Sequence, residues 1–176
     1  MKKTIIALAL CVAIPALACA KKPKKVTESE EPAPAPVVTE DETPEITEEC
    51  LVNISLFVES AKNKAYEDAY GPWLEVYNTC PNANKAIYSR GSQILEWKYN
   101  NASTEEEKEA LRKLVLQMHD KRIKYFGDDP KYPTAYILGQ KGLDYCKFYP
   151  EDPLKLDAYN WLKESVQQMG DKSQLT

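Results

Sequence analysis

A stripe of apolar and small residues between positions 66 and 81 constrains the fold more than any other feature of this chain. Its residues recur at steps of three and four, which places their side chains on one face of an α-helix: Tyr66, Ala69, Trp73 and Val76. The small Ala69 allows a second helix to approach closely, and Trp73 fills the space beside it. Pro81 then ends the helix, because proline has no backbone N–H to donate. The stripe therefore predicts a helix that packs closely against a neighbouring helix.

The spacing from Ala69 to Trp73, Val76 and Pro81, followed ten residues later by Gly91, resembles that of a tetratricopeptide repeat. Repeats of this family are helix–turn–helix units of about 34 residues that stack side by side. The resemblance implies an all-α fold of three antiparallel helical hairpins, stacked as a short right-handed solenoid over residues 47–172. It also implies a scaffold that binds other proteins and argues against an enzyme.

Capping and turn residues indicate the boundaries of the other helices. Thr47 begins the first helix, because its hydroxyl can accept a hydrogen bond from the first turn. A capping box from Ser103 to Glu106 begins the fourth helix, and Gly127 ends it. The sixth helix ends at Gly170. The third helix is expected to begin near residue 84, and its internal Gly91 indicates close helix packing, because glycine costs a helix about 1 kcal/mol relative to alanine.

The first twenty residues are typical of an export signal. Two lysines precede an apolar run, Ile5 to Ile14, that is too short to span a bilayer, and small residues follow up to Ala20. This pattern predicts a signal peptide at residues 1–20 and a periplasmic protein. In the alternative, Cys19 carries a lipid and the protein is a membrane-anchored lipoprotein, although the leucine usual three residues upstream is missing. Both interpretations stay open.

Residues 21–46 form a linker rich in proline and acidic side chains, without an aromatic residue. Such a segment cannot bury enough apolar surface to offset the entropy of ordering it, so we expect it to be disordered. Its Pro-Ala-Pro-Ala-Pro part favours extended polyproline II geometry and would act as a spacer.

Candidate residues for catalysis or metal binding are scarce. His119 is the only histidine and is expected on the surface of the fourth helix. Nucleophilic triads and zinc sites therefore lack their usual partners. We predict no catalytic residue, no cofactor and no metal site. The formal net charge of −4 also gives no basic surface for nucleic acid.

Removal of the signal peptide would leave three cysteines, Cys50, Cys80 and Cys146. In an antiparallel helical hairpin, the start of the first helix lies beside the end of the second, so a Cys50–Cys80 disulfide is geometrically credible. On the chain-entropy model it would stabilise the fold by roughly 3 kcal/mol. Three reduced, buried cysteines are the alternative. Cys146 is expected in the core.

In proteins of the resembled family, partners usually lie against the concave face made by the first helix of each repeat. Carried over to this chain, that face would include Lys85, Tyr88 and Ser92 in the third helix and Tyr136, Gln140 and Asp144 in the fifth. Tyrosine offers a large contact area at small entropic cost. Aromatic residues at helical spacing are also frequent in cores, so core packing remains the alternative for these positions.

The predicted function is a non-catalytic protein–protein interaction scaffold, belonging to a complex of the bacterial cell envelope. One rival is a periplasmic protein that binds glycan or peptidoglycan, with exposed aromatic pairs stacking on sugars; another is an inactive accessory domain of a hydrolase. Membrane contact is expected only if Cys19 is lipidated. Self-association is a further expectation, through an apolar edge that Trp161 and Leu162 would leave on the last helix.

Overall fold

The computed structural model describes residues 44–153 and 155–173. The predicted signal peptide, the candidate lipidation site Cys19 and the linker up to residue 43 lie outside these ranges. Within them the fold is all-α, as predicted: helices alone are found, and no strand. They are α1 (Glu48–Lys62), α2 (Tyr66–Thr79), α3 (Ala86–Asn100), α4 (Glu105–Phe126), α5 (Thr134–Phe148), α6 (Leu156–Met169) and the short 3₁₀ helix η1 (Gly170–Lys172).

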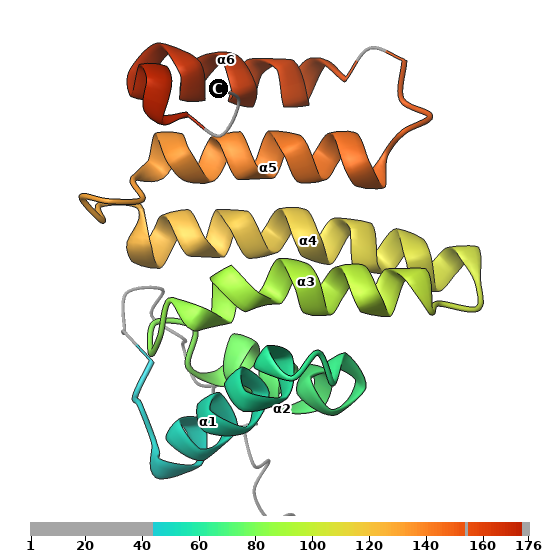
Figure 1. The fold of residues 1–176 in the computed structure, drawn as a ribbon, viewed down its shortest axis with the longest axis vertical. Helices are drawn as coiled ribbons and strands as arrows, with labels where there is room; N and C mark the ends of the chain where they lie inside the picture. Colours follow the sequence, from blue (N-terminus) through green and yellow to red (C-terminus); the bar gives the residue numbers. More distant parts are fainter. Residues whose placement is uncertain (1–43, 154, 174–176) are drawn as a thin grey trace, which may run out of the picture. The chain divides into compact units, whose positions relative to one another are not determined.

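Each helix packs against the next one along the chain, and α1 also contacts α3. Figure 1 shows α3, α4, α5 and α6 following one another in sequence order, with α1 and α2 together beyond α3. None of these helices is long and apolar enough to cross a membrane. Helices α1 to α4 share a core that includes much of the stripe identified in the sequence.

Trp73 and Gly91 join α2, α3 and α4. Trp73 is fully buried, and its indole Nε1 donates a hydrogen bond to the carbonyl of Ile87 (2.7 Å). A Cβ atom on Gly91 would lie 2.5 Å from Sδ of Met118 and 3.1 Å from Nε1 of Trp73. Close packing at Gly91 is therefore confirmed.

The cap of α1 is confirmed and the cap of α4 is corrected. The Cys50 N–H donates to Oγ1 of Thr47 (3.2 Å), as predicted. At α4, however, the cap is Thr104 rather than Ser103: its Oγ1 accepts from the N–H of Glu107 (3.1 Å). The Glu107 carboxylate in turn accepts from the Ser103 N–H (3.1 Å). The sequence holds adjacent hydroxyl residues followed by three glutamates, so it fits a capping box in two registers, and the structure adopts the later one.

The two cysteines of the first hairpin, Cys50 and Cys80, form a disulfide with their Cα atoms 6.5 Å apart. It links the first turn of α1 to the end of α2, the two neighbouring ends of the hairpin. Cys146 is a free, half-buried thiol on α5, so the expectation of a core position was wrong.

The last two α-helices, α5 and α6, pack together through a glycine of α5. A Cβ atom on Gly142 would lie 2.6 Å from Cγ of Leu162, so α5 and α6 approach closely there. Trp161 and Leu162, expected at an exposed edge, are half-buried. The exposed apolar residues of α6 are instead Leu156, Tyr159 and Val166.

Candidate functional site

A row of polar contacts joins α3 to α5 across α4. Ser92 on α3 donates to Oδ2 of Asp144 on α5 (3.3 Å), and Nε2 of His119 on α4 donates to the same oxygen (2.7 Å). About one turn further on, Lys147 of α5 forms an ion pair with Glu96 of α3. These contacts bridge the middle of α3 and the last turns of α5.

His119 is 1% exposed, so its predicted surface position was wrong. Its hydrogen-bond partner, Asp144, lies on another helix and 25 positions further along the chain. No local pattern in α4 indicates such a partner. His119 therefore serves the packing of α3, α4 and α5, and its Nδ1 has no hydrogen-bond partner among the described residues.

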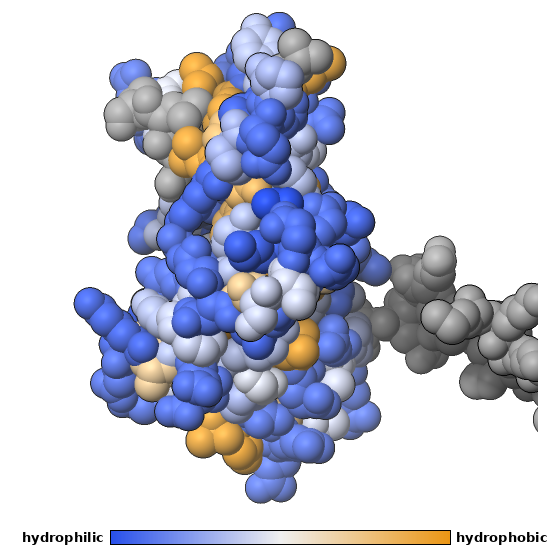
Figure 2. Space-filling model, turned by 90° about the vertical axis from the view of Figure 1, so that its right-hand side faces the viewer, coloured by the Kyte–Doolittle hydropathy of each residue, from blue (hydrophilic) through white to orange (hydrophobic). Residues whose placement is uncertain are grey.

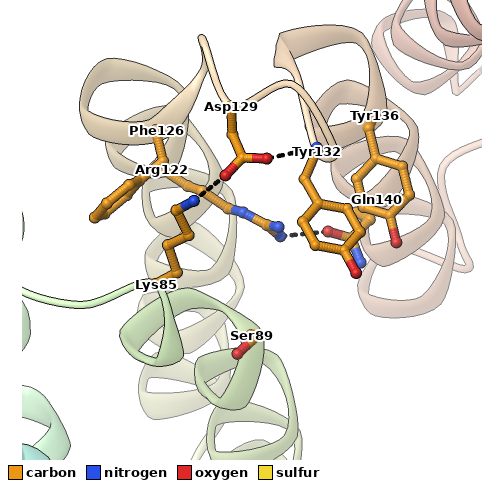
Figure 3. A pocket seen from close by; sticks show the side chains of 8 residues that line it. All are labelled: Lys85, Ser89, Arg122, Phe126, Asp129, Tyr132, Tyr136 and Gln140. Atoms are coloured by element: carbon orange, nitrogen blue, oxygen red, sulfur yellow. Dashed lines mark hydrogen bonds and ion pairs between the residues drawn. The ribbon is translucent and has the colours of Figure 1, made fainter.

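A pocket of about 320 Å³ opens where this row ends, beside the loop between α4 and α5. Figure 3 shows its walls coming from the start of α3, the last turns of α4, the loop and the first half of α5. The lining side chains are Lys85, Ser89, Arg122, Phe126, Asp129, Tyr132, Tyr136 and Gln140.

Asp129 is the anion of the pocket, and it is held by three donors. Lys85 forms an ion pair with its carboxylate, and the backbone N–H groups of Lys131 and Tyr132 donate to its Oδ1 (2.8 and 2.9 Å). The hydrogen bond from Lys85, followed by those from the backbone, lowers the pKa of Asp129 to about 2. Asp129 is therefore charged at neutral pH, and Lys85 is already neutralised by it.

Arg122 supplies a second positive charge from α4. It is only 8% exposed, and its Nη1 donates to Oε1 of Gln140 on α5. Among the residues that the structure describes, no carboxylate lies within ion-pair distance of Arg122. Burial lowers the pKa of its guanidinium, because the surroundings disfavour the charged form.

Two tyrosines form one side of the pocket. The rings of Tyr132 and Tyr136 lie 4.9 Å apart, centre to centre, with an angle of 50° between their planes. In Figure 3 they stand on the loop and on α5, facing the Lys85 and Arg122 side chains across the opening. Both rings are half-buried, so some of their aromatic surface is accessible from the pocket.

The structure brings together most of the six residues predicted for partner binding, and it corrects one. Lys85, Tyr136 and Gln140 line the pocket, whereas Ser92 and Asp144 hydrogen-bond to each other in the polar row. Tyr88 was wrongly placed on this face. It is 1% exposed, and its hydroxyl donates to the buried Pro81 carbonyl (2.9 Å).

Five lining residues were not predicted: Ser89, Arg122, Phe126, Asp129 and Tyr132. Ser89 could have been found from helical spacing, because it follows Lys85 by four residues and precedes Ser92 by three. The others belong to α4 and its loop, which the resemblance does not place on the partner-binding face. Arg122 in particular sits among other charged residues of α4, and only its burial in the structure singles it out.

Comparisons of the chain with protein-family models, with curated proteins and with solved structures find no match. The resemblance to tetratricopeptide repeats therefore remains a prediction from the sequence. Within residues 44–153 and 155–173, no group of three or more His, Cys, Asp or Glu side chains is placed to hold a metal ion.

Proposed function

We propose that the helical domain is a non-catalytic scaffold that binds other proteins in the bacterial cell envelope. Its helices would form three tetratricopeptide-like hairpins, α1–α2, α3–α4 and α5–α6, stacked as a short solenoid. The contact of α1 with α3, and the side-chain contacts of α3 with α5, support this arrangement, because they group the first helices of the hairpins on one face. Export by the predicted signal peptide would bring the domain to the periplasm.

The observation that carries the proposal is the exposure of apolar side chains on both terminal helices. These are Leu51, Val52 and Leu56 on α1, and Leu156, Tyr159 and Val166 on α6. Figure 2 shows hydrophobic residues gathered toward the two opposite ends of the domain. Terminal repeats of a stacked array need a polar outer face to stay soluble alone, and exposed apolar patches mark interaction surfaces. Each end of this domain therefore suits a protein partner.

Site-specific photo-cross-linking in living cells tests this function. A photoreactive amino acid would replace Val52 on α1 or Tyr159 on α6 in the full-length protein. Matched controls would carry it at the exposed Gln168, on the other side of α6 from Tyr159, and at the exposed Lys113 of α4. We expect a light-dependent adduct of defined mass at Val52 or Tyr159 and none at the controls. No adduct at any position, or equal labelling at all four, would contradict the proposal.

A second candidate function is binding of a glycan. It is favoured by the tyrosine pair Tyr132 and Tyr136, which lines a pocket instead of lying in the core. Aromatic rings accessible in a cleft can stack on the apolar faces of sugar rings. This function uses the α3–α5 face, whereas the protein-binding function uses the ends of the domain, so one protein can perform both.

A further inference from the structure

The lining of the pocket has a net positive charge. Its cations are Lys85 and Arg122 and its carboxylate is Asp129, which pairs directly with Lys85 and acts on Arg122 at longer range. A guanidinium has five N–H donors, and among the described residues Arg122 makes a single hydrogen bond, to Gln140. Removing an ion from water without a counter-charge is costly, and guanidinium–carboxylate pairs with paired hydrogen bonds are among the strongest polar contacts. The chemistry of the pocket therefore favours a carboxylate.

The size and surroundings of the pocket indicate a compact ligand. Its volume of about 320 Å³ lies near the lower limit of small-molecule sites, about 300–1,000 Å³. Beyond the pocket, the Ser92–Asp144 hydrogen bond and the exposed Glu96–Lys147 ion pair bridge α3 and α5. An extended peptide would have to lie over these contacts or displace them to follow that face. A compact ligand needs no such change.

The remaining walls suit a ring that carries hydroxyl groups. Tyr132 and Tyr136 offer aromatic surface on one side, and Phe126 lies on the other side with Lys85 Nζ 5.9 Å from its ring centre. Ser89 and Gln140 add a hydroxyl and an amide to the lining. A sugar ring combines apolar C–H faces with hydroxyl groups at its edge, so it matches both kinds of wall.

We propose that this pocket binds a sugar acid, with its carboxylate on Arg122 and its ring against Tyr132 and Tyr136. The inference rests on the second function proposed above, glycan binding, and is independent of the apolar ends of the domain. It adds the ligand class, an acidic instead of a neutral sugar, and the residue that makes this distinction.

Titration of the purified, exported protein followed by two-dimensional ¹H–¹⁵N NMR tests the proposal, because this method detects weak binding. The ligands are D-glucuronate, the neutral counterpart D-glucose, and acetate, which has the carboxylate without the ring, all at one ionic strength. We expect saturable shifts at Gln140 and Tyr136 with glucuronate, with a dissociation constant on the order of 1 mM, typical for a ligand of this size. Glucose and acetate should each bind at least tenfold more weakly.

Three variants test which side chains are responsible for the binding of glucuronate. Arg122→Met removes the charge at similar volume and should weaken glucuronate binding at least tenfold. Replacing a buried charged group by an apolar one is often tolerated, but Tyr136→Leu provides a second test should Arg122→Met fail to fold, with an expected loss of at least threefold. Lys124→Met makes the same charge change on an exposed position of α4 outside the pocket, and binding should stay within twofold of the wild type.

Several outcomes would overturn the proposal. Equal affinity for glucuronate and glucose would exclude a role for the carboxylate, and unchanged binding by Arg122→Met would exclude that residue. A further titration compares trialanine that has a free C-terminal carboxylate with trialanine amide. If the free acid binds and glucuronate does not, the pocket is a site for peptide C-termini. Glucose binding with Tyr136 shifts would retain glycan binding and reject only the acidic ligand; no sugar binding at all would reject both.

Discussion

Asp129 gives the pocket a pH dependence that can be measured on stability. Its pKa in the folded protein is lowered to about 2 by the hydrogen bond from Lys85 and by backbone donors, whereas an aspartate in an unfolded chain titrates near 3.9. A carboxyl group with the lower pKa in the folded state stabilises the protein above the unfolded pKa. This contribution is lost progressively as the pH falls from about 4 to about 2.

We therefore predict that Asp129→Asn lowers the free energy of unfolding at pH 6, and that the difference from the wild type shrinks below pH 4. Urea unfolding at pH 6, 4 and 3 measures it. The substitution Asp128→Asn, at the exposed neighbouring position, is the control and should have little effect at any pH. A difference that stays constant between pH 6 and pH 3 would mean that the charge of Asp129 is not what stabilises the loop.

Tyr88 and His119 show what helical spacing leaves undetermined at single residues. Lys85 has two neighbours on its own face, at positions 88 and 89, and the structure turns the larger, more apolar Tyr88 inward and leaves Ser89 on the pocket. The burial of His119 depends on Asp144 in a different helix. Spacing within one helix contains no information about such a partner, so only some polar residues of the site could be predicted.

Between helices, glycine positions set how closely α5 and α6 approach. A Cβ at Gly142 would meet Leu162 at 2.6 and 2.8 Å and the Ala158 carbonyl oxygen at 3.2 Å. The backbone of α6 cannot move away cheaply, so we predict that Gly142→Ala lowers the free energy of unfolding by about 1–3 kcal/mol, as overpacking usually does. Thermal or urea unfolding of the full chain measures this loss.

The cause is tested by repeating the substitution in a Leu162→Ala background, in which the side chain that the new Cβ would meet is shortened. Gly142→Ala should cost less there than in the wild type, because the effects of two residues in contact are not additive. An equal cost in both backgrounds, or no effect of Gly142→Ala, would show that close packing against Leu162 is not what requires the glycine.

The disulfide between Cys50 and Cys80 joins α1 to the end of α2, and its contribution to stability can be measured separately from that of side-chain packing. It closes a loop between residues 30 positions apart, for which the chain-entropy model gives roughly 3–4 kcal/mol. We predict that replacing both Cys50 and Cys80 by serine lowers the free energy of unfolding by about that amount. Addition of reductant should destabilise the wild type equally but leave the double variant unchanged. Cys146→Ser, at the free cysteine, should respond to reductant like the wild type.

The order and approximate limits of the helices could be predicted from the sequence because they depend on local features. Thr47, Gly127 and Gly170 lie at the ends of α1, α4 and α6 as expected. Ambiguity remained where two registers were equally good, as at Ser103 and Thr104. The pocket depends on α4, its loop and α5 meeting α3, and this long-range arrangement has no local signal.

At the scale of the whole molecule, the two apolar ends differ from each other. One end presents Val52 and its neighbours on α1, and the other presents Tyr159 and its neighbours on α6, where Leu156 is 62% exposed. A contact between unlike surfaces is heterologous, and it forms open chains when the rotation does not close a ring. We therefore predict that the protein self-associates head to tail at high concentration, α1 of one copy on α6 of the next.

Sedimentation velocity over a range of concentrations tests this arrangement with two single substitutions. Val52→Glu and Tyr159→Glu should each abolish association, because each removes one of the two surfaces. Mixed in equal amounts, the two variants should form a dimer and nothing larger, since each still carries one intact surface. Gln168→Glu, at an exposed position on the other side of α6 from Tyr159, should behave like the wild type. If Tyr159→Glu is monomeric while Val52→Glu still dimerises alone, α6 pairs with α6 of a second copy. A wild type that is monomeric at every concentration, and that binds no hydrophobic dye, would show that neither end mediates self-association.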